Sequence, residues 1–84
     1  MVRKIIDTKI RTLIKAYLLF NKGKKCTAHE IAEFINTNGF GLNQYSLHPK
    51  RVSHMINSAR WNNSNILYGV HVEKIDGRNH YWLN

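Results

Sequence analysis

The dipeptide Asp76-Gly77 restricts the fold of this chain more than any other feature. It lies between two segments rich in β-branched and aromatic residues, at 66–75 and 78–83. A two-residue Asp-Gly connection between such segments is typical of a β-hairpin, because both turn positions need a positive φ. The sequence therefore predicts a C-terminal two-stranded hairpin.

This turn also predicts the register of the hairpin. With Asp76 and Gly77 as the loop, Val72 faces Tyr81, and side chains alternate from there between the two faces. A slip of one residue would break this alternation. The expected core face carries Val70, Val72, Tyr81 and Leu83, and the opposite face carries His71, Glu73, His80 and Trp82.

Two helices are predicted in the first half of the chain. Apolar residues at three- and four-residue steps indicate a helix over about 3–20, which the run Asn21-Lys22-Gly23 ends. Thr27 and Glu30 match a capping box, in which each side chain accepts a hydrogen bond from the backbone N–H of the other residue. A short second helix is therefore expected to start there and to end near Asn38.

A third helix is predicted over about 46–60. Ser46 is the expected N-cap, and Pro49 is tolerated in the first turn, where an amide hydrogen is not needed. The residues spaced for one buried face are Val52, Met55, Ile56 and Ala59.

The segment before this third helix is uncharged and rich in turn-forming residues. It contains Phe40, Leu42 and Tyr45, which we expect to fold back onto the core. The alternative is an exposed apolar patch that would mark a partner site.

The size and composition of the chain limit the class of protein. With 84 residues we expect one domain over 1–84, of the α+β, mainly α class, with a core too thin for a deep substrate cavity. Cys26 is the single cysteine, which excludes a disulfide-rich secreted scaffold. Charges at the N-terminus match neither a signal peptide nor a membrane span. A cytoplasmic or nucleoid-associated protein without membrane contact is expected.

The arrangement of three helices and a hairpin resembles the winged helix-turn-helix superfamily of DNA-binding domains. Residues 27–35 look like its second helix, 49–56 like the start of its recognition helix, and 77–83 like the returning strand of its wing. The segment 39–45 is longer than the compact bacterial pattern, and no single subfamily is indicated. The resemblance implies a three-helix winged-helix domain that binds double-stranded DNA.

The third helix carries the side chains that suit such a role. Steps of 100° from Val52 place Lys50, His54 and Asn57 on the opposite stripe, with Trp61 at its end. No Asp or Glu occurs between Ser46 and Arg60. An amide pairs with adenine edges, and Lys or Arg pairs with guanine or phosphate. The flanks of this stripe add Arg51, Ser53 and Ser58 as candidate DNA contacts.

Two basic clusters are expected to hold phosphates. Lys24 and Lys25, with Lys22, precede the helix start at Thr27, where free amides and the helix dipole favour anions. Lys74 and Arg78 flank the hairpin turn. Thirteen Lys and Arg against five Asp and Glu give a net charge of +8, a field that attracts polyanions. The plainer alternative is a basic, solvated surface.

No metal site, cofactor or enzyme activity is predicted. Cys26 and His29 have a spacing that can share a metal, and His71 and His80 lie on one predicted hairpin face, but a convincing four-ligand pattern is missing. A metal site between subunits is the alternative. Neither a glycine-rich phosphate loop nor a nucleophile–base motif occurs.

Two functions from different classes are consistent with these patterns. The favoured one is sequence-specific binding of double-stranded DNA in transcriptional control, with a homodimer through the first helix as an option. The other is a protein-interaction module within a replication, transcription or RNA-processing assembly, which would use the segment around Phe40 and Tyr45 or the hairpin face with Trp82.

Overall fold

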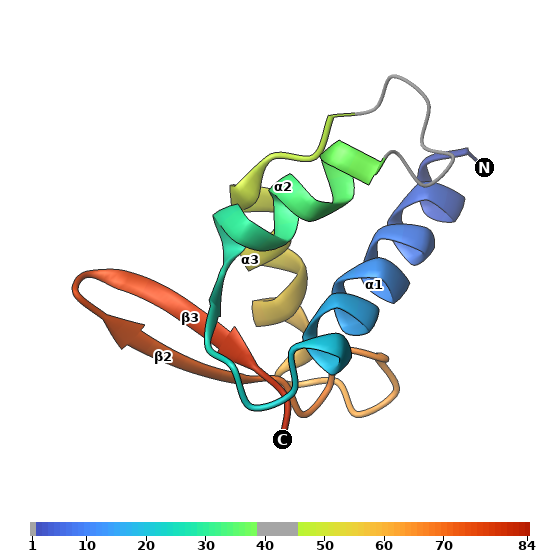
Figure 1. Cartoon of the computed structure of the whole chain (residues 1–84). Coiled ribbons are helices and arrows are strands. Elements are labelled where there is room, and N and C mark those ends of the chain that lie inside the picture. Colours follow the sequence, from blue (N-terminus) through green and yellow to red (C-terminus); the bar gives the residue numbers. More distant parts are fainter. Residues whose placement is uncertain (1, 39–45) are drawn as a thin grey trace.

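The computed structural model describes the backbone of residues 2–38 and 46–84, and the side chains of residues 6–38 and 46–84. Three helices form the body, and a three-stranded antiparallel sheet extends from one side of it (Figure 1). This confirms the mainly helical α+β class with a C-terminal hairpin. The elements are α1 (Val2–Phe20), β1 (Cys26–Thr27), α2 (Ala28–Asn38), α3 (Pro49–Ala59), β2 (His71–Ile75) and β3 (Arg78–Trp82).

Helix α1 follows the predicted apolar stripe. Ile10, Ile14 and Leu18 are fully buried along it. After the helix, the side-chain amide of Asn21 donates to the carbonyl of Tyr17 over 2.8 Å. Gly23 then adopts a φ of 83°, a conformation that side chains rarely take, and the chain turns toward the sheet.

The predicted capping box at the start of α2 is confirmed. The backbone N–H of Glu30 donates to Oγ1 of Thr27 over 3.1 Å, and the N–H of Thr27 donates to Oε1 of Glu30 over 3.0 Å. Each side chain thus satisfies a donor that the first turn of a helix leaves without a backbone partner.

The sheet has one strand more than predicted. Cys26 pairs with Tyr81 and Thr27 with His80, so β1 lies beside β3 and the strand order is β1-β3-β2. The two-stranded prediction was therefore incomplete. A strand of two residues is too short to show the alternation by which strands are recognised.

The predicted N-cap of α3 was wrong. The cap is His48, whose Nδ1 accepts a hydrogen bond from the backbone N–H of Lys50 over 3.1 Å. Pro49 follows in the first turn, as expected. The imidazole nitrogen takes the place of the hydroxyl expected from Ser46, and α3 starts nearer the proline.

The predicted start of the first hairpin strand was also wrong. Residues 66–70 form turns, and β2 begins only at His71. The side chain of Asn65 accepts a hydrogen bond from the N–H of Leu67 over 2.9 Å, and Gly69 has a φ of 98°. These local bonds direct Leu67 into the core, where it is buried.

The predicted turn and register of the hairpin are confirmed. Asp76 and Gly77 have φ values of 52° and 77°, and Val72 pairs with Tyr81. Tyr81 is fully buried, and Val70, Val72 and Leu83 also belong to or pack on the core. We call the sheet face with Val72 and Tyr81 the inner face, and the face with His71, Glu73, His80 and Trp82 the outer face.

One cluster of buried side chains joins all three helices to the sheet. The predictions for Phe40, Leu42 and Tyr45 lie outside the described residues. Within the part of the chain that is described, none of the helices combines the length and apolar character needed to cross a bilayer.

Candidate nucleic-acid interface

Helix α3 separates a buried face from a polar one. Val52, Met55, Ile56 and Ala59 are buried, as the sequence predicts. The side chains on the other side are exposed, and we call them the polar face of α3: Lys50, His54, Asn57 and Ser58. Among the described residues, Lys50, His54 and Asn57 have no side-chain hydrogen bond or ion pair. These groups are available to a ligand.

Arg51 lies on the flank of α3 and is held by α1. Its Nη2 donates to both carboxylate oxygens of Asp7, each over 2.8 Å. Both side chains are partly shielded from water, which strengthens the attraction. In this arrangement Arg51 fixes the position of α3 against α1, a partner that the sequence does not reveal because the two residues lie 44 positions apart.

Ser53 lies on the other flank and is bound to the sheet. Its Oγ accepts a hydrogen bond from the hydroxyl of Tyr81 over 3.0 Å. Ser53 is half-buried, so its own O–H keeps the ability to donate. The two flanks of α3 are therefore bound to opposite neighbours, while its polar face stays open.

The hairpin divides its two basic residues between its faces. Lys74 pairs with Asn79, two residues along each strand from Val72 and Tyr81. Both therefore belong to the inner face, which is also bound to α3. Near the turn they are exposed. Arg78 belongs to the outer face with His80. Asn79 is a residue that the sequence interpretation missed, although the predicted register would have placed it.

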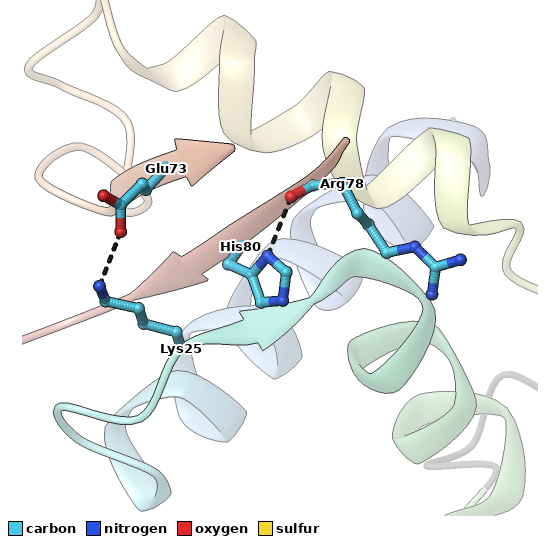
Figure 2. A network of polar contacts seen from close by, with 4 residues as sticks. All are labelled: Lys25, Glu73, Arg78 and His80. Carbon is cyan, nitrogen blue, oxygen red and sulfur yellow. Dashed lines mark hydrogen bonds and ion pairs between the residues drawn. The ribbon is translucent and has the colours of Figure 1, made fainter. Parts of the chain in front are cut away.

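Lys25 also lies on the outer face of the sheet. Its Nζ donates to Oε1 of Glu73 over 2.6 Å and lies 4.9 Å from the ring centre of Trp82. Figure 2 shows His80 between this pair and Arg78, with its Nδ1 2.9 Å from the Arg78 carbonyl oxygen. Lys25 is thus engaged within the fold, on the sheet face opposite the one that contacts α3.

The start of α2 is less open to anions than the sequence suggests. Thr27 is buried, and its N–H and hydroxyl are occupied by Glu30. The hydrogen bond from the Thr27 backbone holds the pKa of Glu30 below its ordinary value, so a carboxylate already lies at this helix end. Lys24 is exposed, on the loop that Gly23 joins to the Leu83 carbonyl over 2.7 Å.

The predicted site residues therefore do not lie together on one surface. The polar face of α3 and Lys74 belong with the inner face of the sheet, while Lys25 and Arg78 belong to the outer face. Lys24 lies in the loop before β1, next to the C-terminal end of β3 and away from the hairpin turn. The first group, the polar face of α3 with Lys74, lies on the side of the sheet that Tyr81 and Ser53 join to α3, and it is the candidate interface.

The cysteine and histidines do not form a metal centre in the described part of the chain, which holds no group of three or more His, Cys, Asp or Glu suited to a metal. Cys26 is fully buried, and its Sγ lies 3.5 Å from the Lys24 carbonyl oxygen. Burial raises the pKa of the Cys26 thiol, which keeps it protonated and unreactive. His71 stacks on Trp82 with ring centres 5.4 Å apart.

Comparison of the chain with protein-family models, with curated proteins and with solved structures gives no match.

Proposed function

We propose that this chain is a winged-helix domain that binds double-stranded DNA, with α3 in the major groove. The observation that carries the proposal is the polar face of α3. It presents Lys50, His54 and Asn57 to solvent while the opposite side of the helix is in the core. A helix of this kind fits the major groove, where cations and amides meet phosphates and base edges.

The rigid attachment of α3 supports this role. Arg51 ties one flank to α1, and Ser53 ties the other to β3. A recognition element held on both sides loses little conformational freedom on binding, so more of the contact energy remains as affinity.

The hairpin adds a second contact in this proposal. Lys74 and Asn79 extend the inner face of the sheet toward the turn, and the sheet extends beyond the helical body (Figure 1). A cation and an amide at this place suit the phosphate backbone beside the groove that α3 occupies. The net charge of +8 brings a polyanion to this surface from a distance.

The test is a comparison of affinities for a selected and a random duplex. A duplex is first selected from a randomised library with the wild-type protein, and Kd is then measured by fluorescence anisotropy. The double variant Lys50→Ala, Asn57→Ala should lose at least about tenfold of the discrimination between the two duplexes. Lys9→Ala, which removes an exposed lysine from α1, is the control and should keep it. Unchanged discrimination in the folded double variant would contradict the proposal.

A salt titration separates DNA binding from a protein-interaction role. Binding dominated by phosphates weakens steeply with added salt, since it releases counterions. A contact through an apolar surface changes little. A flat salt dependence together with an equal affinity for all duplexes would favour the protein-interaction module.

The proposed homodimer would use α1. Leu19 and Phe20 are exposed at the C-terminal end of this helix, and large exposed apolar side chains are a feature of contact surfaces. Sedimentation equilibrium at micromolar concentration should then give twice the monomer mass, and Phe20→Ala should restore the monomer.

A further inference from the structure

Trp61, two residues after the end of α3, exposes 86% of its surface. Tryptophan is highly buried on average, because its large apolar ring gains much by leaving water. Trp61 is neither a member of the core cluster nor one of the side chains packed against it, so core packing does not account for this residue. An aromatic side chain left in this position is available to a ligand.

The position of Trp61 continues the polar face of α3. Arg60, the residue between Ala59 and Trp61, keeps helical angles with φ −60° and ψ −29°. Steps of about 100° from Val52 therefore bring Trp61 to the side opposite the buried face, in line with Lys50 and His54. The ring stands at the C-terminal end of that face.

The backbone that carries Trp61 is ordered by local hydrogen bonds. The N–H of Asn62 donates to the Ala59 carbonyl over 3.2 Å, and the N–H of Ser64 donates to the Asn62 side chain over 3.0 Å. Further along, Leu67 anchors the segment in the core. The backbone that carries the exposed ring is thus held in place, which lowers the entropy that binding would cost.

The electrostatic surroundings of Trp61 favour an anionic ligand. The guanidinium carbon of Arg60 lies 5.6 Å from the centre of the Trp61 ring. Glu73 lines the same surface hollow as Arg60, but its carboxylate is paired with Nζ of Lys25 over 2.6 Å. A flat π surface beside the Arg60 cation suits a nucleobase with its phosphate better than an apolar protein surface.

We propose that Trp61 stacks on an unstacked nucleobase at the end of the segment that α3 contacts, while Arg60 binds the adjacent phosphate. This inference rests on the proposed DNA binding. Bases inside a regular duplex have both faces covered by their neighbours, so stacking on Trp61 needs a base that is unpaired or a step that is opened. The preferred ligand is then a duplex with a bulged base rather than a fully paired one.

The experiment compares two duplexes that differ only by one bulged base. Anisotropy measurements should give a Kd for the bulged duplex that is at least about fivefold lower than for the paired one. Trp61→Ala should abolish this preference, and Trp61→Phe should retain part of it, because phenylalanine still stacks. Tyr68→Ala is the matched control, since Tyr68 is an aromatic residue that is 53% exposed but lies in the turns before β2, and it should leave the preference intact.

A spectroscopic readout tests the stacking directly. In a Trp82→Phe background, Trp61 is the single tryptophan, and its fluorescence should be quenched more strongly by the bulged duplex than by the paired one. Equal quenching by both duplexes, or an unchanged preference in Trp61→Ala, would overturn the inference. If Trp61→Ala instead leaves both Kd values unchanged and abolishes self-association, the ring belongs to a protein contact and the inference is wrong.

The failure of this inference differs from the failure of the proposed function. Loss of the bulge preference in Trp61→Ala concerns the ring alone, whereas Lys50→Ala, Asn57→Ala should weaken binding to both duplexes. If the double variant keeps the wild-type Kd values while Trp61→Ala loses the bulge preference, the proposed role of α3 is wrong and that of Trp61 stands.

Discussion

The hydroxyl of Tyr81 donates a hydrogen bond to Oγ of Ser53 over 3.0 Å and thereby joins the last strand to α3. Tyr81 is fully buried and is one of the largest core side chains, while Ser53 is half-buried on the flank of the helix. The orientation of α3 relative to the hairpin is therefore set by a specific polar contact as well as by apolar packing.

We expect the loss of Ser53 to cost more than the loss of the Tyr81 hydroxyl. Ser53→Ala leaves a buried hydroxyl without this acceptor and should lower the free energy of unfolding by about 1–3 kcal/mol. Tyr81→Phe removes the hydroxyl itself and should cost about 1 kcal/mol. Urea denaturation measures both. Ser58→Ala, at an exposed position of α3, corrects for helix propensity, and a larger loss in Tyr81→Phe would contradict this account.

The ion pair between Asp7 and Arg51 should stabilise the folded protein. Arg51→Gln and Asp7→Asn should each lower the free energy of unfolding by about 1 kcal/mol, and the double variant should lose less than the sum. A double-mutant cycle in urea measures the coupling. Additive losses would show that the two side chains act independently. The coupling should shrink in 1 M salt, which screens the pair because it is only partly buried.

Glu30 should make folding sensitive to acid. Its pKa is lowered chiefly by the hydrogen bond from the Thr27 backbone, so its stabilisation is complete above the pKa of an unfolded glutamate, about 4.3, and is lost as the pH falls below that value. Glu30→Gln keeps a capping box but cannot ionise. Between about pH 5 and 3, the range around that pKa, the thermal midpoint of the wild type should therefore fall more steeply than that of Glu30→Gln. Glu33→Gln, at an exposed position of α2, should retain the wild-type slope.

A change at the hairpin turn tests the contact of the hairpin with DNA. Asp76→Asn preserves the turn, because Asn-Gly suits the same positive φ values, and it removes a negative charge from the tip. If the tip lies near phosphates, Kd should fall about twofold to fivefold at low salt. Glu33→Gln removes one carboxylate from α2 and controls for net charge. An equal gain of DNA affinity in the two variants would mean that only the net charge of the protein matters and that the hairpin tip does not contact DNA.

Local signals explain the part of the fold that could be predicted. Asp76-Gly77 restricts the backbone strongly enough to predict the register, and the pair Thr27 and Glu30 predicts the start of α2. The buried face of α3 follows from helical spacing. Each of these depends on residues close together in the chain.

Contacts between distant residues explain what could not be predicted. Strand β1 exists because Cys26 and Thr27 meet the last strand, and Lys25 is engaged because Glu73 lies 48 positions away. Within the candidate interface, the sequence predicts the polar face of α3 correctly as an exposed face. The sequence does not show that Lys25 lies on a different surface. Its place on the outer face of the sheet follows from the pairing of β1 with β3, and β1 was not predicted.

The central place of β3 in the strand order has a consequence for how the molecule acquires its structure. β3 follows β1 and β2 in the chain, and yet it lies between them in the sheet. During synthesis the helices can form early, but the sheet is completed only when residues 78–82 have emerged. Because Tyr81 also contacts Ser53, the orientation of α3 is settled at the same late moment. A nascent chain that stops before β3 would carry the residues of the candidate interface without the contact that orients them.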